Sequence, residues 1–526
     1  MPTSAPIMPR RLDLLGLALL AIVARLVPGQ RIVDDAFITF RYSRNLAEGH
    51  GFVYNLGERV LGTTTPLYTA IMTLAGSLAN GDYPAAAVLV NALAGGVEVV
   101  LVALIAQHLT QQRAIALWLG AAWAVAPFAV TFAIGGMETS VHNVMMLGAW
   151  YAYLSARPRA LGVLCALGVL TRPDALLWAL PILAHQLWRA WRERPATQPS
   201  PRAWLPWQTW ASGLIVYLPW FFFSWAYFGN PIPQTITAKA NVYFLRPTQA
   251  FEIFLQRYAM PFEEGLALGT PGIVVGLFLY PTLALIGLRA ATAQEKRALP
   301  LMVFPWLYML VYSIANPLIF RWYQTPPLPA YYLAIGAGVW ALLVLLPRPA
   351  WRQYAVAVLA AFTLGFLLNG WTLSPDHGPD RPAPRMAFHE LELHYARMAQ
   401  TLVQEYGVTP DSWVAAGDIG AVGYYSRARI FDTVGLVTQG NAPYYEDRDS
   451  LDDQRLPEMN YVIPSNLLLD AEPDYMILME GFIRNTLLQE PDFFAQYQQV
   501  GIIETDYYGT GMLAFQHAPT SREREP

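Results

Sequence analysis

Cysteine and lysine are scarce in this chain of 526 residues, and both shortages restrict its chemistry. Cys165 is the single cysteine, so the chain forms no internal disulfide and no cysteine-based metal cluster. No HExxH pattern or histidine pair supports a zinc hydrolase. Lys239 and Lys296 are the only lysines, so arginine carries nearly all of the positive charge.

Charge itself is scarce, because 14% of the residues are charged whereas 55% are hydrophobic and the mean hydropathy is +0.30. A soluble enzyme of this length is seldom so apolar, so the composition predicts a mainly α, polytopic helical membrane protein. The net charge of -4 is unevenly distributed, with a basic excess before Trp371 and an acidic excess after it. We therefore expect a membrane domain at 1–371 and a second domain at 372–526.

About eleven apolar segments are candidates to cross a bilayer, although several are shorter than the ~20 residues that a crossing requires. If the segments alternate in direction, the arginine-rich connections share one face, which the positive-inside rule identifies as cytoplasmic. The chain is then a multi-pass protein of the plasma membrane, with a cytoplasmic N-terminus and an extracytoplasmic second domain. A full crossing at Thr63–Ala79 would invert every later segment, so this stretch is expected on the membrane surface or as a re-entrant helix. The segments are 14–27, 83–108, 114–134, 139–154, 161–170, 175–188, 207–228, 266–288, 298–314, 328–346 and 354–371.

Two charged residues fall inside these segments. Arg25 is expected to snorkel from the outer end of the first segment. Glu98 falls inside the second, so it either pairs with another helix or indicates a wrong boundary.

The second domain has the pattern of a small α/β unit. Residues 385–407 form an amphipathic helical pattern that ends in Gly407. Short β-type runs follow, separated by turn residues, at 412–418, 429–435, 474–480 and 511–517. The polar content is too high for lipid, and the excess of Asp and Glu suits an aqueous surface.

The loop at 31–61, which we call the first loop, contains the most informative motif, "DDAFITFRYSRNLAEGHG". Its polar and apolar residues recur at helical spacing, and Gly49 is placed to end the helix. Helix capping alone accounts for an acid at such a start. Two adjacent acids, Asp34 and Asp35, beside arginines at the membrane surface favour a functional role instead.

The first loop resembles that of the GT-C membrane glycosyltransferases, in the branch that contains the mycobacterial terminal arabinofuranosyltransferase. Further blocks resemble that family in the same order: "GGMETS" (135–140), "LTRPDALL" (170–177), "FGNPIPQTITAKA" (228–240), "FRWYQTPPLPA" (320–330) and "GDIGAVGYYS" (417–426). The chain departs from the family at Leu61, where an acid is usual, and at Thr65, where an Asn is usual. These two positions bear on the choice of sugar or acceptor.

The resemblance implies transfer of a sugar, with arabinofuranose as the branch's example, from a polyprenyl-phosphate donor at the outer membrane face. The acceptor is a hydroxyl of an envelope glycan, lipid or protein, the reaction is expected to be inverting, and no nucleic acid is involved. A carboxylate of the first loop is the implied base, which makes Asp34 the first candidate and Asp35 the second candidate or an orienting partner. Two facing acids would raise one pKa toward neutrality. A divalent cation between them is the alternative.

The donor phosphate needs cations, and the candidates are Arg41, Lys239 and Arg321. Lipid-headgroup contact is the alternative for Lys239, and interfacial snorkelling is the alternative for Arg321. Other candidates for the substrate cavity are Glu138, Tyr42, Arg172, Tyr323 and Asp418. A helix cap also explains Glu138, and an ion pair with Asp174 also explains Arg172.

A polytopic transporter or flippase of envelope lipids is the competing interpretation. Such proteins carry ionisable residues near the membrane midplane and often contain inverted repeats. Here the charges gather at the ends of the segments and no repeat is visible, so the sequence favours a transferase.

Overall fold

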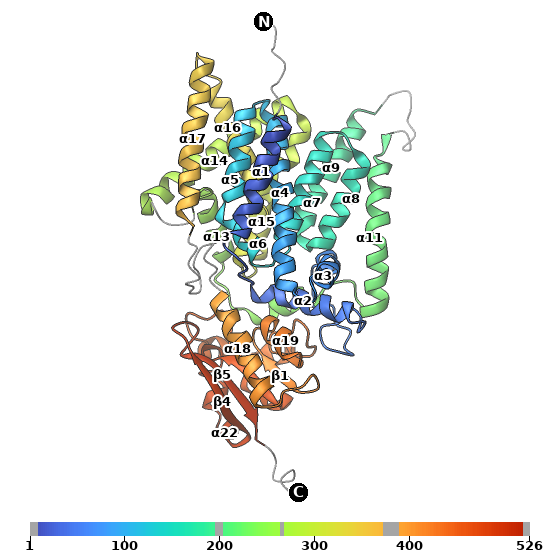
Figure 1. The fold of residues 1–526 in the computed structure, drawn as a ribbon, viewed down its shortest axis with the longest axis vertical. Helices are drawn as coiled ribbons and strands as arrows, with labels where there is room; N and C mark the ends of the chain where they lie inside the picture. Colours follow the sequence, from blue (N-terminus) through green and yellow to red (C-terminus); the bar gives the residue numbers. More distant parts are fainter. Residues whose placement is uncertain (1–8, 195–203, 264–267, 372–388, 519–526) are drawn as a thin grey trace.

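The computed structural model describes residues 9–194, 204–263, 268–371 and 389–518. Long helices run side by side along the molecule, and a sheet-containing unit lies beyond one end of this bundle (Figure 1). We call that end the base and residues 389–518 the C-terminal unit. The predicted class, a helical membrane protein with a small α/β unit, is confirmed.

The bundle is built from apolar helices of unequal length. In the described part of the chain, six are long and apolar enough to cross a membrane, and the bent pair α5 and α6 would make a seventh. The predicted crossings at 14–27, 139–154, 161–170 and 175–188 form helices of only 14 to 17 residues. The bundle helices are α1 (Arg11–Leu26), α4 (Tyr83–Thr110), α5 (Arg113–Val125), α6 (Pro127–Ile134), α7 (Thr139–Leu154), α8 (Pro158–Thr171), α9 (Leu176–Arg192), α11 (Trp207–Phe228), α14 (Gly269–Gln294), α15 (Leu299–Ala315), α16 (Leu328–Leu343) and α17 (Pro349–Asn369).

A buried ion pair joins three of these helices. Arg25 of α1 does not snorkel, because its side chain is fully buried and its Nη2 lies 3.8 Å from Oε2 of Glu98 on α4. Asn143 of α7 donates a hydrogen bond of 2.6 Å to the other oxygen of Glu98. Arg25 and Asn143 are polar partners of the kind that a charged side chain inside an apolar segment needs, so Glu98 belongs inside its predicted segment.

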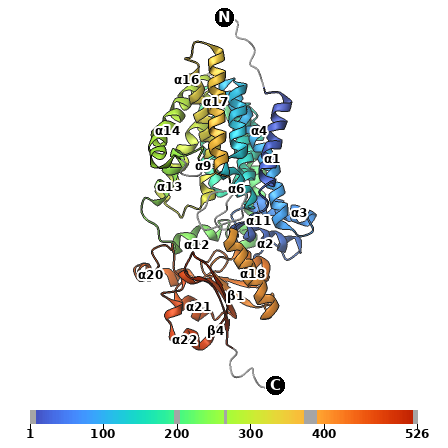
Figure 2. The ribbon, with the colours of Figure 1, turned by 60° about the vertical axis from the view of Figure 1, so that its left-hand side comes forward.

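Short helices occupy the base. The helix predicted in the first loop is α2 (Asp34–Ala47), which Gly49 follows with a φ of +85° that favours glycine. Next comes α3 (Pro66–Leu78), whose 13 residues are fewer than a crossing needs and which lies beside α2 in Figure 1. The helix α12 (Gln234–Val242) also lies at the base (Figure 2), whereas α13 (Gln249–Ala259) packs against α14 and α15.

The C-terminal unit begins with α18 (His389–Glu405), which confirms the predicted amphipathic helix. Its described strands form one sheet in the order β2-β1-β3-β5-β4, with β1, β2 and β3 parallel and β5 antiparallel to both neighbours. Figure 2 shows α18 on one side of this sheet and α21 and α22 on the other. The elements are β1 (Trp413–Ala416), α19 (Gly420–Ser426), β2 (Arg429–Asp432), α20 (Arg448–Gln454), α21 (Ser465–Ala471), β3 (Tyr475–Met479), α22 (Pro491–Gln496), β4 (Tyr497–Glu504) and β5 (Gly511–His517).

Candidate active site

The two acids of the first loop occupy the first turn of α2, at the junction of the bundle and the C-terminal unit. Successive residues of a helix point about 100° apart, so the two side chains meet different partners. Both carboxylates of Asp34 and Asp35 also lie at the positive end of the helix dipole.

Asp34 is bound to the C-terminal unit. Its two carboxylate oxygens accept hydrogen bonds of 2.7 Å from the backbone N–H groups of Gly420 and Ala421, at the start of α19. A Cβ atom at Gly420 would lie 1.9 Å from the carbonyl oxygen of Asp34, so only glycine permits this approach. Asp34 therefore holds α2 and α19 together through these two hydrogen bonds.

Asp35 has more freedom and a cationic neighbour. Its Oδ2 lies 3.7 Å from Nζ of Lys239 on α12, and the two side chains are 29% and 20% exposed. Burial opposes the charge of Lys239, but the carboxylate of Asp35 outweighs it and raises the lysine pKa. The lysine is therefore a cation that stays beside Asp35 across the physiological range.

Two cavities meet at this pair. The large cavity has a volume of about 770 Å³ and lies between the base of the bundle and the C-terminal unit. The small cavity, of about 260 Å³, extends from the same pair toward the bundle. Residues that line both cavities are Asp35, Ile38, Lys239, Trp322 and Leu436. A substrate bound in either cavity would therefore lie next to Asp35.

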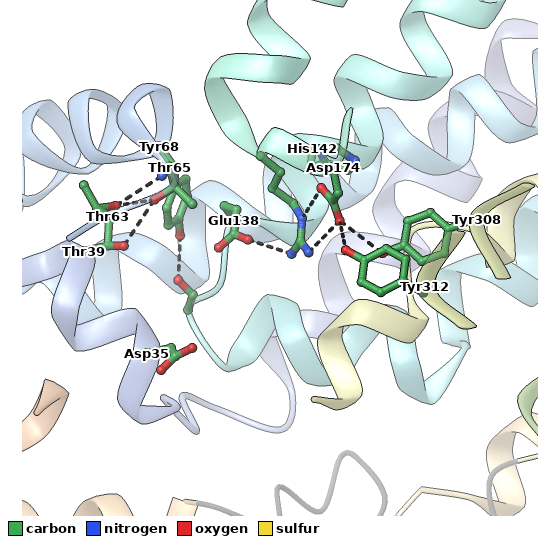
Figure 3. Close-up of polar contacts among 12 residues, drawn as sticks. Asp35, Thr39, Thr63, Thr65, Tyr68, Glu138, His142, Asp174, Tyr308 and Tyr312 are labelled. Carbon is green, nitrogen blue, oxygen red and sulfur yellow. Dashed lines mark hydrogen bonds and ion pairs between the residues drawn. The ribbon is translucent and has the colours of Figure 1, made fainter. Parts of the chain in front are cut away.

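An ion-pair network forms one wall of the small cavity (Figure 3). Arg172 donates to Glu138 at 2.8 Å and to both oxygens of Asp174 at 2.9 Å. Tyr308 and Tyr312 each donate to Asp174 at 3.1 Å. The expected Arg172–Asp174 ion pair is confirmed, and Glu138 uses its side chain for Arg172 rather than as a cap of α7.

Hydroxyl groups form the opposite wall of the small cavity. Oγ1 of Thr65 lies 3.1 Å from Oγ1 of Thr63 and 3.4 Å from Oγ1 of Thr39 (Figure 3). The aromatic ring of Tyr323 also lines this cavity and lies 5.2 Å from the Arg172 guanidinium. Hydroxyls, a carboxylate and an aromatic ring are groups that bind the hydroxyls and apolar faces of sugars.

Asp418 and Arg321 line the large cavity. Tyr395 donates a hydrogen bond of 2.8 Å to Asp418, and burial raises the pKa of this carboxyl to about 6. The guanidinium of Arg321 lies 5.6 Å from the ring of Phe128 on α6, at the base of the bundle. An acidic and a basic residue therefore line this cavity together with the Asp35–Lys239 pair.

Arg41 and Tyr42 hold the first loop in place instead of lining either cavity, as far as the described residues define them. Arg41 is 2% exposed and donates to oxygens on both sides of the interface: the carbonyls of Tyr54, Gly423 and Ala428 and the side chain of Asn55. The Tyr42 hydroxyl donates to Val60 and accepts from the N–H of Gly62. Their contacts favour docking roles.

The described residues do not fit the divalent cation considered between Asp34 and Asp35. They contain no group of three or more His, Cys, Asp or Glu residues suited to a metal. Both oxygens of Asp34 already accept amide N–H groups, and Lys239 supplies the positive charge next to Asp35.

Glu392 of α18 was not identified from the sequence. It is 3% exposed, lines the large cavity and accepts a hydrogen bond of 2.7 Å from the N–H of Asp34. One signal was available, because Glu392 precedes Tyr395 by three residues and so falls on the apolar face of the amphipathic helix.

Comparisons with known proteins cover different parts of the chain. A family model described as a domain of unknown function (DUF8728) matches residues 386–520. The chain is 31% identical over 229 residues to the terminal beta-(1->2)-arabinofuranosyltransferase of Mycobacterium tuberculosis. That match covers 40% of this chain and 35% of the relative, so the chain matches about a third of the relative's length.

The fold, in contrast, is matched along nearly the whole chain. The structure of ArnT from Cupriavidus metallidurans bound to undecaprenyl phosphate aligns with a TM-score of 0.59 at 13% identity, covering 97% of this chain and 98% of ArnT. The chain has the GT-C fold. The archaeal oligosaccharyltransferase AglB from Archaeoglobus fulgidus, in complex with an inhibitory peptide and a dolichol-phosphate, aligns at 0.55 and 12% identity, covering 98% and 74%.

Within this GT-C fold, the helices α2 and α12, which carry Asp35 and Lys239, lie at the base of the bundle next to the C-terminal unit (Figure 2). The multi-pass membrane character predicted from composition agrees with the apolar helices and with the fold.

Proposed function

We propose that this protein is a membrane glycosyltransferase that moves a sugar from a polyprenyl-phosphate donor to a hydroxyl group of an envelope glycan, lipid or protein. The observation that carries the proposal is the Asp35–Lys239 pair at the junction of two cavities, at the base of a GT-C bundle. A base and a cation side by side are what transfer from a phosphate leaving group requires.

Asp35 is the base in this proposal. It accepts the proton of the acceptor hydroxyl as that oxygen bonds to the anomeric carbon of the sugar. The bond between the anomeric carbon and the phosphate oxygen breaks, and its electron pair leaves with the polyprenyl phosphate. One displacement without a protein nucleophile inverts the anomeric carbon.

The cations and the cavity walls have separate tasks. Lys239 and Arg321 stabilise the departing phosphate by charge. Glu138, Arg172, Tyr323 and the threonine hydroxyls surround the sugar or acceptor in the small cavity, and Asp418 faces substrate in the large cavity. Asp34 and Arg41 contribute by holding the first loop against the C-terminal unit.

The proposed site lies on the extracytoplasmic face of the plasma membrane, with the N-terminus in the cytoplasm. The distribution of arginine between the two ends of the apolar segments supports this orientation. Arabinofuranose is the first donor sugar to test, because the relative in Mycobacterium tuberculosis is an arabinofuranosyltransferase.

A lipid flippase is the second function considered, and the geometry disfavours it. The ionisable residues Arg25 and Glu98 pair with each other inside the bundle and line neither of the two cavities, which lie at the base.

The test is transfer by the purified protein in liposomes, given polyprenyl-phosphate arabinofuranose labelled in the sugar, with envelope glycan and glycolipid acceptors. We expect labelled acceptor and free polyprenyl phosphate in equal amounts. Movement of intact donor across the bilayer without cleavage would identify a flippase instead. Intact donor that neither moves nor reacts with any supplied acceptor, for each polyprenyl-phosphate sugar tested, would contradict the proposal.

A further inference from the structure

The first turn of α2, which carries Asp35, depends on a residue from the far end of the chain. Val33 precedes this helix and offers no side-chain cap within the described structure. Glu392 of α18 supplies the missing acceptor, because its Oε1 lies 2.7 Å from the backbone nitrogen of Asp34. An acceptor for one of the free N–H groups at a helix start stabilises the first turn of that helix.

Three helices are tied together at this point. Glu392 of α18 caps α2, Asp34 of α2 caps α19, and Tyr395, one turn after Glu392, binds Asp418 just before α19. Each contact joins segments that are far apart in the sequence or that belong to different elements. The position of Asp35 is therefore set by the C-terminal unit and not by the bundle alone.

The environment of Glu392 disfavours a negative charge. Its Oε2 is buried and has no hydrogen-bond partner among the described residues. The titratable groups that face it are two carboxyls, Asp34 on α2 and Asp418 before α19, and the Tyr507 hydroxyl between β4 and β5, and none of them is a cation. Burial raises the pKa of Glu392 well above its ordinary value, and Asp34 raises it further. When Glu392 is protonated, a carbonyl oxygen remains to accept the Asp34 N–H.

We propose that Glu392 is a positioning residue that caps α2 from the C-terminal unit and thereby aims Asp35 at the acceptor hydroxyl. The inference rests on the proposed role of Asp35 as the base. The C-terminal unit then helps to complete the active site. Misplacing a catalytic group by about 1 Å costs up to ~100-fold in rate, so the position of Asp35 matters.

Three variants of the full-length protein in liposomes test this inference. Glu392→Gln keeps a carbonyl oxygen for the Asp34 N–H and remains neutral, so we expect a kcat within about 3-fold of the wild type. Glu392→Ala removes the cap, and we expect kcat to fall by roughly 10- to 100-fold with KM changed less than 3-fold. Glu390→Ala, two residues earlier on the exposed side of α18, is the matched control and should behave as the wild type.

The pH profile separates positioning from simple folding. As pH rises through the raised pKa of Glu392, the wild type gains an uncompensated charge beside Asp34 and Asp418, so its kcat should decline over that range. Glu392→Gln cannot ionise, and this decline should be absent or shifted to higher pH. This comparison uses two folded proteins and remains informative even if Glu392→Ala does not fold.

The outcomes distinguish the two proposals. Full activity of Asp35→Asn would overturn the role of Asp35 itself. Loss of activity in Asp35→Asn with wild-type kcat in Glu392→Ala would overturn the positioning role alone. A Glu392→Gln protein that is folded but as slow as Glu392→Ala would also overturn it, because the charge or proton of Glu392 would then be required.

Discussion

Asp34 and Asp35 are adjacent in the chain, yet their side chains meet opposite environments. Both acids line the large cavity, but Asp34 accepts backbone N–H groups of α19 with both oxygens, whereas Asp35 also lines the small cavity and lies beside Lys239. Burial and the nearby Asp418 raise the pKa of Asp34 well above its ordinary value, but a proton on Asp34 would displace one of its two N–H donors and weaken the contact with α19. We therefore assign the catalytic role to Asp35 and the structural role to Asp34.

Substitution of Lys239 tests whether this lysine stabilises the departing phosphate. Replacing it by Met keeps the apolar stem near the ring of Phe320, which Nζ approaches at 4.9 Å, but removes the charge beside Asp35. We expect kcat to fall roughly 100-fold, as for loss of one electrostatic contact to the transition state. The measurement is the steady-state transfer rate, with Lys296→Met, at the other lysine, as the matched control. Equal rates for Lys239→Met and wild type would exclude this role.

The raised pKa of Asp418 in the large cavity should make the stability of the protein depend on pH. Burial raises its pKa to about 6 from an ordinary value of 3.8, so the folded protein binds a proton that the unfolded chain releases. Stability should therefore decrease as pH rises from about 4 to about 6, by up to about 3 kcal/mol from this group. Asp418→Asn removes the titration, so its thermal midpoint relative to wild type should rise across that window and then level off. A difference that does not change with pH would contradict the assignment.

At the scale of elements, the interface between α2 and α19 carries the coupling of the two parts. Gly420→Ala would place a Cβ atom 1.9 Å from the carbonyl oxygen of Asp34, so α19 must move away. We expect faster proteolysis of the C-terminal unit and a lower kcat, because Asp34 loses its amide partners. Gly365→Ala on α17, where a Cβ atom would meet nothing within 4 Å, is the control and should change neither property. Wild-type protease resistance and rate in Gly420→Ala would show that the interface is not tight.

Elements with a clear apolar period could be predicted from the sequence. The run YMILM of β3 is buried throughout, and α18 shows apolar residues at helical spacing before Gly407, whose φ is +71°. The strand β4, YQQVGIIE, was missed because its exposed glutamines and the register shift between Gln499 and Gly501 interrupt the alternation.

The site could be predicted only in part, because its contacts join distant segments. Two adjacent acids marked the first loop without indicating that both line the large cavity and that only Asp35 also lines the small one. The bond between Glu392 and Asp34 spans 358 residues, and no local pattern encodes it. An arginine that donates to backbone carbonyls looks the same in sequence as one that binds a phosphate. The sequence therefore could not predict the docking role of Arg41.

For the whole molecule, the orientation in the membrane follows from the arginine distribution and is open to a direct test. The single cysteine is buried, so Cys165→Ala provides a background for single-cysteine labelling. We expect a membrane-impermeant maleimide to label Asp453→Cys in the C-terminal unit from outside intact cells. Gln111→Cys, in the connection between α4 and α5, should be labelled only after the membrane is opened. The reverse pattern would invert the proposed topology.

The most direct measurement of the central claim is single-turnover sugar transfer by Asp35→Asn, with Asp34→Asn for comparison. The claim predicts that Asp35→Asn lowers the rate by about 10²- to 10⁴-fold, as for loss of a general base, while donor binding persists. Asp34→Asn should keep a faster rate but unfold at lower temperature, because an amide side chain accepts only one of the two N–H bonds to α19. Wild-type rates in Asp35→Asn, with transfer abolished in a folded Asp34→Asn, would contradict the account.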